Sequence, residues 1–200
     1  MTKLLCIVIG YFIGCLQSAY FVGKIWNVDI RQHGSGNLGT TNALRVLGKK
    51  AGLITFLCDV LKAVAGFVIC YNLFDKNYIM GMYACLGVIL GHDFPFYLGF
   101  KGGKGIAATI GMGLCMVSTI SPVYWLSAIT GICGLLVKGY VSMGSMMFIV
   151  MLPVLSAVIR TDIEVTIITA FLAALAIYQH RANIKRIIAG NENTLFKKKK

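Results

Sequence analysis

Residues 4–23 read LLCIVIGYFIGCLQSAYFVG, twenty consecutive positions without a charged side chain. The hydrocarbon core of a bilayer is about 30 Å thick, so a helix that crosses it needs about 20 mostly apolar residues. By the same measure, further candidate spans follow at 51–73, 78–99, 106–120, 122–137, 141–159 and 163–178. The sequence therefore predicts an all-α, polytopic membrane helix bundle with seven transmembrane helices, forming a single domain over residues 1–196.

The composition excludes most soluble classes of protein. Of 200 residues, 58% are hydrophobic and only 13% are charged, and the mean hydropathy is +0.79. Soluble domains are about 45–50% apolar and about 25% charged, and a domain of this size buries only part of its surface. A soluble nucleic-acid binder is therefore a poor fit. The seven cysteines lie in apolar runs without a CxxC pair, so we expect core packing rather than a metal site or disulfides.

Basic residues are distributed unevenly between the two sides that seven spans would create. The formal net charge is +12. One side would receive fifteen Lys and Arg residues, and the other only Lys3, Lys76 and Arg160. Because Lys and Arg accumulate on cytoplasmic loops, we expect the N-terminus outside and the C-terminus in the cytoplasm. The tail at 197–200 is expected to be disordered and attracted to anionic lipid.

Polar residues gather in three segments on the predicted cytoplasmic side. The first reads RQHGSGNLGTTN at 31–42 and is followed by Arg45. The second runs over 91–105 and ends in FKGGKG, and the third begins HRANIKR at 180 and continues to 192. The three histidines of the chain, His33, His92 and His180, fall one in each segment. This distribution favours one shared site.

The glycines of the first segment match the spacing of a dinucleotide-binding fingerprint, Gly34-x-Gly36-x-x-Gly39, with Asp59 twenty residues further on. That fingerprint requires a preceding strand, whereas Asp59 lies in an apolar span. The usable chemistry is that glycines let backbone N–H groups approach an anion closely. A plain turn between helices, with its basic residues serving topology only, is the alternative. The candidate binding residues here are Arg31, Ser35, Gly36, Asn37, Thr41, Asn42 and Arg45.

The segment FKGGKG at 100–105 differs from a Walker A loop, because Gly105 follows Lys104 and Leu98 stands where the first glycine should be. No magnesium or other metal ligand is implied. Two lysines in a glycine frame still suit a phosphate group, and a purely topological basic loop is the alternative. The candidate residues are Lys101, Gly102, Gly103 and Lys104.

Asp59 and Lys62 lie mid-span, three residues apart on one helical face. Unpaired, each would cost about 2.5–3.5 kcal/mol at the bilayer centre. They can form an ion pair that only locks helices together, or they can shape a polar pocket. His92 and His180 lie at predicted helix ends, where capping competes with catalysis.

Taken together, GSGNLGTTN (34–42), GHDFPFYLGFKGGKG (91–105) and HRANIKRIIAGNE (180–192) resemble the three signature segments of the bacterial acyl-phosphate:glycerol-3-phosphate acyltransferases. The resemblance covers nearly the whole chain. Two departures concern pocket details: Leu-Gln-Ser18-Ala stands where a Gly-Ser-Ile-Pro-like stretch is frequent, and Ala63 follows Lys62 where glycine is usual.

The resemblance implies an enzyme of the bacterial cytoplasmic membrane that carries out the first acylation of phospholipid synthesis. Its donor would be a fatty acyl phosphate, its acceptor sn-glycerol 3-phosphate and its product lysophosphatidic acid, without a cofactor. Functional coupling to the acyl-phosphate-forming enzyme is expected. Binding of nucleic acid is not expected. A small transporter for an organic phosphate is the alternative.

The resemblance also implies roles for individual residues. Ser35, Asn37 and Lys104 would hold the acyl phosphate head group. Glycerol phosphate would be held by Arg45, His180 and Asn183, together with Lys101 and Arg31. A substrate phosphate could accept the hydroxyl proton, and His92 and His180 are the candidate general bases. The candidate catalytic residues are therefore Ser35, Lys104, His180 and His92.

Overall fold

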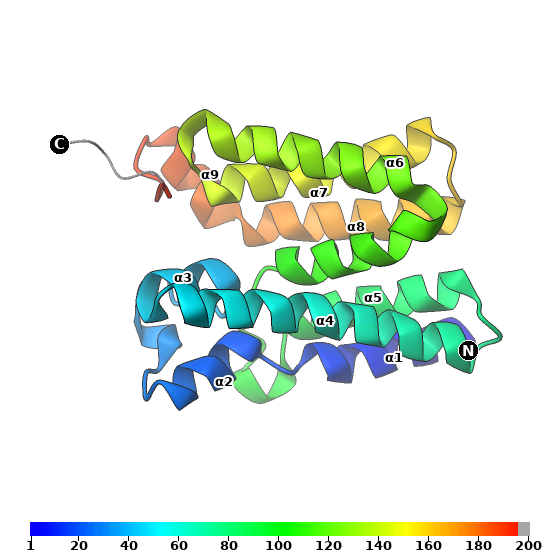
Figure 1. Cartoon of the computed structure of the whole chain (residues 1–200), viewed down its shortest axis with the longest axis horizontal. Helices are drawn as coiled ribbons and strands as arrows, with labels where there is room; N and C mark the ends of the chain where they lie inside the picture. The colour runs from blue at the N-terminus through cyan, green and yellow to red at the C-terminus, as the bar shows by residue number, and fades with distance from the viewer. Residues whose placement is uncertain (196–200) are drawn as a thin grey trace. The chain divides into compact units, whose positions relative to one another are not determined.

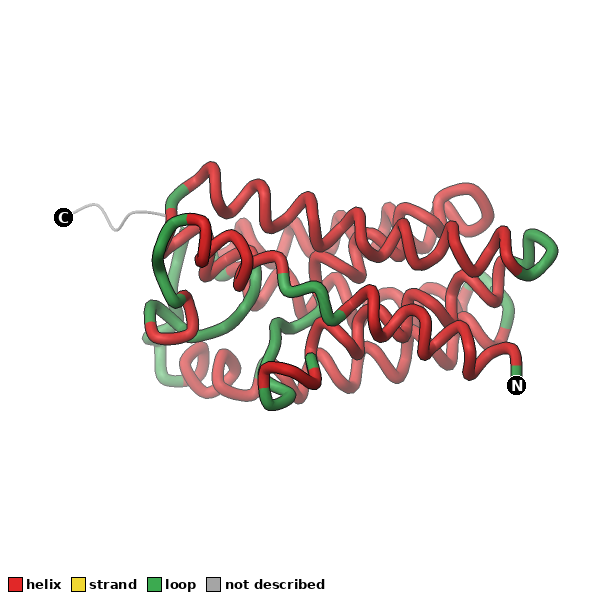
Figure 2. The backbone as a smooth tube through the Cα atoms, turned by 90° about the horizontal axis from the view of Figure 1, so that it is seen from below, coloured by secondary structure: helices red, strands yellow, loops and turns green. Residues whose placement is uncertain are grey.

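The computed structural model describes residues 1–195, without the side chains of residues 117–121. In this part of the chain all regular structure is helical (Figures 1 and 2). The chain forms two compact units, unit 1 over Met1–Cys115 and unit 2 from Met116 onward. The single domain over 1–196 stays a prediction, and the basic tail at 197–200 lies outside the described residues.

Unit 1 contains most of the helices that surround the first two polar segments. In chain order these are α1 (Thr2–Gly14), α2 (Ser18–Ile25), the 3₁₀ turn η1 (Ile30–Gln32), α3 (Thr40–Leu47), α4 (Lys49–Leu73), α5 (Tyr78–Asp93), the 3₁₀ turn η2 (Phe96–Leu98) and the start of α6 (Ile106–Lys138).

The first span differs from the uninterrupted helix that its sequence predicts. Helix α1 ends at Gly14 and α2 begins at Ser18, and Gln17 between them has an extended backbone. The two helices together still make one candidate span, Thr2–Ile25. The break exposes the last carbonyls of α1, which must find other donors inside a membrane.

Glycines bring α1 and α5 into backbone contact. Gly10 and Gly14 on α1, and Gly87 and Gly91 on α5, lie so close to the facing helix that a Cβ on any of them would overlap its backbone. Small residues four apart are a common contact surface between membrane helices, because packing replaces the hydrophobic effect in lipid. This contact fixes the end of α5 beside the break between α1 and α2.

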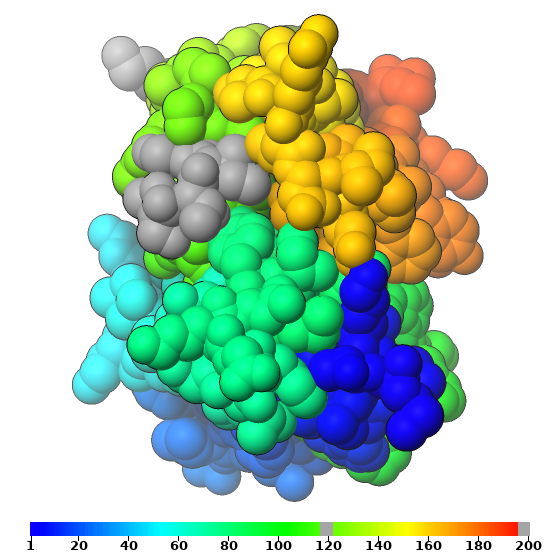
Figure 3. Space-filling model, turned by 90° about the vertical axis from the view of Figure 1, so that its right-hand side faces the viewer, coloured from blue at the N-terminus to red at the C-terminus, as the bar shows by residue number. Residues whose placement is uncertain are grey.

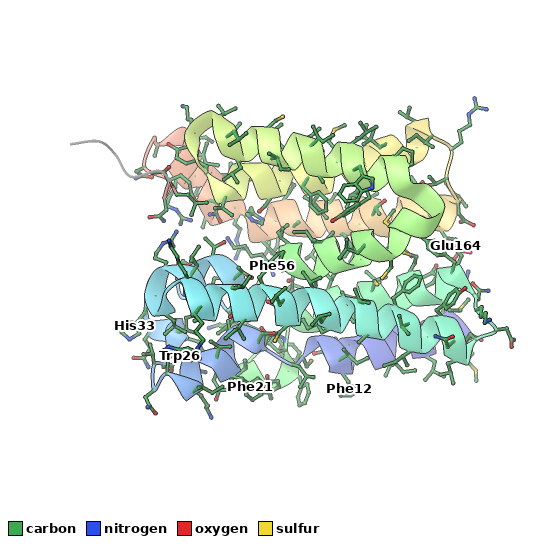
Figure 4. The ribbon with its side chains drawn as sticks, in the orientation of Figure 1. Phe12, Phe21, Trp26, His33, Phe56 and Glu164 are labelled. Atoms are coloured by element: carbon green, nitrogen blue, oxygen red, sulfur yellow. The ribbon has the colours of Figure 1, made fainter. Side chains whose placement is uncertain are left out.

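Helix α4 has an apolar outer face, as expected for contact with lipid, and a polar inner face. Leu53, Leu57 and Leu61 follow one another at intervals of four residues and are 47–61% exposed. Asp59 and Lys62 point the other way and are buried. Phe12 on α1 and Phe21 on α2 are likewise exposed and point outward (Figure 4).

The N-terminus and the turn between α4 and α5 lie at one end of unit 1, and the glycine-rich loops lie away from that end (Figure 1). Figure 3 looks onto the former end, where the N-terminal residues lie beside this turn. The Lys3 ammonium there lies 5.4 Å from the centre of the Tyr83 ring.

Unit 2 contains the rest of α6, α7 (Val141–Val158), α8 (Ile163–Gln179) and α9 (Arg181–Ile188). The chain bends by 57° between α8 and α9, at His180. After α9 it returns to the start of α7, where Leu195 N–H donates to the Gly139 carbonyl at 2.9 Å.

Four helical segments of the described chain are long and apolar enough to cross a membrane. They are Thr2–Ile25, Lys49–Leu73, Tyr78–Leu98 and Val141–Val158, and the bent pair of α8 and α9 would make a fifth. Helix α6 continues through Pro122, and its apolar parts, Ile106–Met116 and Pro122–Lys138, are each shorter than these spans. The protein is therefore a multi-pass membrane bundle, and the count of seven stays a prediction.

Candidate functional site

A buried ion pair lies at the centre of unit 1. Lys62 Nζ lies 2.8 Å from Asp59 Oδ1, one turn away on α4, and both side chains are almost completely enclosed. Ser18 Oγ, at the start of α2, donates to the same carboxylate oxygen at 2.8 Å. The pair satisfies the two charges that would otherwise be costly in the bilayer.

Lys62 also compensates for the broken helix. Its ammonium donates to the Gly14 carbonyl at 3.2 Å and to the Leu16 carbonyl at 3.0 Å. The carbonyl between them, that of Cys15, accepts from Tyr97 Oη at 2.8 Å. The last carbonyls of α1 are therefore bonded to side chains from α4 and η2, which pins the break in place.

His92 belongs to the same cluster. Its Nδ1 lies 2.8 Å from Lys62 Nζ and 3.5 Å from Asp59 Oδ1. In the shorter contact a charged ammonium can only donate, which assigns Nδ1 as the acceptor. The neutral ring then carries its proton on Nε2. In this arrangement neither ring nitrogen offers a lone pair to a substrate proton, so the geometry favours a role for His92 other than general base.

The second glycine segment lies directly on the end of α5. Gly102 N–H donates to the Asp93 carbonyl and Gly103 N–H to the His92 carbonyl, both at 3.0 Å. A Cβ on Gly102 would overlap the His92 carbonyl, and one on Gly103 would overlap the His92 ring. Both glycines are therefore required for packing, while Lys101 is exposed and Lys104 is half-buried.

Asn42 organises the first glycine segment instead of pointing into solvent. Its Nδ2 donates to the carbonyls of Ile30 at 3.2 Å and His33 at 3.1 Å, and its Oδ1 accepts from Ser35 N–H at 2.9 Å. Only 1% of Asn42 is exposed. Gly34 stands against this amide with a φ of +63°, a conformation that favours glycine. The interactions support a loop-shaping role for Asn42.

Arg31 is engaged by a neighbouring carboxylate. Its Nε and Nη2 donate to the two oxygens of Asp29 at 2.9 and 2.8 Å. Hydrogen bonding from this guanidinium lowers the pKa of Asp29 to about 2. A phosphate would have to compete with Asp29 for Arg31.

The other candidates of the first segment differ in exposure. Three residues are exposed: Ser35, Arg45 and His33, which lies beside α3 in Figure 4. Three candidates are of intermediate exposure: Gly36, Asn37 and Thr41.

The first two segments meet, although they are far apart in sequence. Leu38 N–H donates to the Gly102 carbonyl at 3.4 Å. The Leu38 side chain is buried with Ile30, and Leu98 packs against the same cluster. The loops that hold Ser35 and Lys104 therefore form one surface in unit 1.

The third segment forms a hydrogen-bonded network within unit 2. His180 Nδ1 lies 2.7 Å from the Ala176 carbonyl, which can only accept, so the lone pair of a neutral His180 ring is on Nε2. Asn183 Nδ2 donates to Glu192 Oε1 at 2.8 Å. The same oxygen accepts from Ser142 Oγ at 3.0 Å, and Arg186 Nε donates to Glu192 Oε2 at 2.8 Å. The meeting of this segment with the other two stays a prediction.

Comparisons with known proteins identify the family. A family model described as "Glycerol-3-phosphate acyltransferase" matches residues 4–190. The chain belongs to this family. The acyltransferase is 42% identical to the glycerol-3-phosphate acyltransferase of Thermoanaerobacter sp. (strain X514), over 99% of this chain and 98% of the relative. It is 40% identical to that of Clostridioides difficile (strain 630), over 96% and 95% of the two chains.

Solved structures agree with the family assignment. The acyltransferase resembles the crystal structure of PlsY (YgiH), an integral membrane glycerol 3-phosphate acyltransferase, in its glycerol 3-phosphate form. The TM-score is 0.87 at 31% identity, and the match covers 98% of this chain and 96% of that one. The lysophosphatidic acid form of the same protein matches with a TM-score of 0.84. The acyltransferase is thus an integral membrane enzyme of phospholipid synthesis.

Sequence reasoning missed several polar partners in the acyltransferase. Gln17 is completely buried, and its Nε2 donates to the His92 carbonyl at 2.9 Å. The adjacent polar pair Gln17-Ser18 inside an apolar run was the available signal. For Ser142 the sequence offers no such signal, because a single serine in a membrane helix does not stand out. Among the described residues, no group of His, Cys, Asp or Glu could hold a metal ion.

Proposed function

We propose that the acyltransferase moves a fatty acyl group from acyl phosphate to sn-glycerol 3-phosphate and releases lysophosphatidic acid and phosphate. The acceptor and product correspond to the two forms named for the solved relative. The donor is the proposed part. It would be supplied by an acyl-phosphate-forming enzyme with which this protein is functionally coupled.

The observation that carries this proposal is the contact between the two glycine-rich loops. The hydrogen bond from Leu38 N–H to the Gly102 carbonyl places the loop of Ser35 beside the loop of Lys104. Two phosphate-bearing substrates require two neighbouring sites with backbone and cationic donors. An acyl tail can remain among apolar helices while its head group reaches these loops.

The reaction needs little covalent help from the protein. A glycerol hydroxyl oxygen forms the new bond to the acyl carbonyl carbon, and the bond from that carbon to phosphate breaks. Ser35, Asn37 and Lys104 hold the acyl phosphate, with Thr41 as a further donor and Gly36 allowing close backbone approach. Gly102 and Gly103 pack against His92 and so place the loop of Lys104. Arg45, His180 and Asn183 hold glycerol phosphate, assisted by Lys101 and Arg31. Orientation and donors aimed at the developing oxyanion supply the rate acceleration.

The hydroxyl proton passes to a substrate phosphate oxygen or to His180. The two histidine candidates differ in tautomer: Nδ1 of a neutral His180 ring donates to the Ala176 carbonyl, so its acceptor nitrogen is Nε2. His92 contacts Lys62 through Nδ1, which supports a role in positioning.

Purified acyltransferase should convert acyl phosphate and labelled glycerol 3-phosphate into labelled lysophosphatidic acid without acyl-CoA or acyl carrier protein. Parallel reactions with acyl-CoA as the only donor control for donor choice. Proteoliposomes that accumulate labelled glycerol phosphate without forming acylated product would instead support an organic-phosphate transporter.

We further propose seven spans in the bacterial cytoplasmic membrane, with the N-terminus outside and the active site at the cytoplasmic face. The fifteen basic residues on one predicted side support this orientation. Within unit 1, the N-terminus and the α4–α5 turn share one end (Figure 1), as this topology requires.

A fluorescent protein that folds only in the cytoplasm should fluoresce when fused after Lys200 and stay dark when fused before Met1. The same reporter inserted after Lys76 should also stay dark. Fluorescence from the N-terminal fusion, or its absence from the C-terminal one, would contradict the proposed topology.

A further inference from the structure

Lys62 lies where three parts of unit 1 meet. Its ammonium contacts Asp59 on its own helix, the carbonyls of Gly14 and Leu16 at the break of the first span, and His92 Nδ1 at the end of α5. These four contacts fix the ammonium from several directions. Only 6% of the Lys62 side chain is exposed, so the ammonium is almost completely enclosed by these contacts.

The His92 ring is held between Lys62 and the second glycine segment. Lys62 contacts Nδ1 on one side. On the other side a Cβ added to Gly103 would overlap Nε2 and both neighbouring ring carbons. The His92 carbonyl also accepts from Gly103 N–H at 3.0 Å and from Gln17 Nε2 at 2.9 Å. Ring and backbone of His92 thus both define where Gly103 lies.

From this geometry we infer that Lys62 and His92 are positioning residues for the lysine loop, in which Lys62 holds the His92 ring and the ring sets the place of Gly103 and hence of Lys104. The inference rests on the proposed role of Lys104 in holding a substrate phosphate. It adds a role for the buried Lys62 and His92 side chains, which need not touch substrate.

The physical reason is that Lys104 follows Gly103 directly, so a displacement of Gly103 moves the lysine with it. Misplacing a substrate-holding group by about 1 Å can cost about 10²-fold in catalytic efficiency. A buried ring whose nitrogen is fixed by an ammonium is a rigid support, whereas a loop of glycines and lysines has no rigidity of its own.

The test is a double-mutant cycle on Gly103 and His92. Gly103→Ala should raise the KM for acyl phosphate or glycerol phosphate by about tenfold or more, because the new methyl group meets the ring. His92→Ala removes the obstacle. The double variant should therefore return to the KM of His92→Ala alone. Independent effects that multiply in the double variant would overturn the inference.

The His92 variants also separate positioning from proton transfer. His92→Gln keeps an acceptor for Lys62 and should lie closer to the original KM than His92→Ala does. If His92→Ala lowers kcat by more than about 10²-fold with an unchanged KM, the residue acts in the chemical step and the inference fails.

Tyr97→Phe serves as the matched control for the break in the first span. It removes the hydrogen bond to the Cys15 carbonyl. The contacts of His92 with Lys62 and with Gly103 remain. Tyr97→Phe should lower thermal stability without changing either KM, whereas Lys62→Met should raise KM in the fraction of protein that remains folded. Equal KM values for these two variants would show that the cluster only stabilises the fold.

Failure of this inference can be told apart from failure of the proposed function. If Lys104→Ala and Ser35→Ala both retain full activity, the loops do not hold substrate and the proposed site is wrong. If Lys104→Ala is inactive while Gly103 and His92 show no coupling, only the positioning role is wrong.

Discussion

Lys104→Ala should lower kcat/KM for acyl transfer by about 10² to 10³-fold in folded protein. Loss of a single preorganised donor to a developing charge costs about this much in other acyl-transfer enzymes. Lys104 is half-buried between Gly103 and Gly105, both buried, so bulk solvent substitutes poorly for its charge. Initial rates with acyl phosphate and labelled glycerol phosphate measure the effect.

Lys76→Ala is the matched control, because Lys76 lies in the turn between α4 and α5 at the other end of unit 1. It removes the same charge from the chain and should leave the rate unchanged. Ser35→Ala should also lower turnover strongly, since its hydroxyl is proposed to hold the acyl phosphate. Full rates for both Ser35→Ala and Lys104→Ala would refute the site.

Asp59→Ala should destabilise the protein by about 3–5 kcal/mol, because it leaves the Lys62 ammonium buried without its counter-charge. The carboxylate oxygen that is lost contacts Lys62 Nζ at 2.8 Å and Ser18 Oγ at 2.8 Å. Thermal unfolding of purified protein in detergent, followed by circular dichroism, measures the change in stability.

The double variant Asp59→Leu with Lys62→Met replaces the ion pair by apolar groups of similar size. It should be more stable than Asp59→Ala, since no buried charge remains. The two carbonyls that Lys62 serves would lose their donor in the double variant, so we expect partial recovery. A double variant less stable than Asp59→Ala would show that the ammonium bonds to the broken helix outweigh the ion pair.

The helices of unit 1 could be predicted because apolar length is a local property of the chain. The expected stretches at 51–73 and 78–99 correspond to α4 (Lys49–Leu73) and to the candidate span Tyr78–Leu98. The break at Gln17 could not be predicted in the same way. It depends on Lys62 and Tyr97, which supply donors to the freed carbonyls from other elements.

In the candidate site, too, one part could be predicted from the sequence and another part depends on tertiary contacts. Glycine and lysine patterns in sequence indicate which segments can bind phosphate, because that capacity resides in the residue types. They do not indicate which side chains stay available. Asn42 bonds the loop backbone, and Arg31 pairs with Asp29, although the sequence suggests both as substrate ligands.

By itself, the sequence determined that this is a multi-pass helical membrane protein of the glycerol-3-phosphate acyltransferase family. The reason is that hydropathy and signature segments are properties of consecutive residues. Only the tertiary structure decided that Leu38 joins the two glycine loops and that Lys62 and His92 lie beneath one of them. Such contacts depend on close backbone packing, as between α1 and α5, and a linear pattern carries no information about those distances.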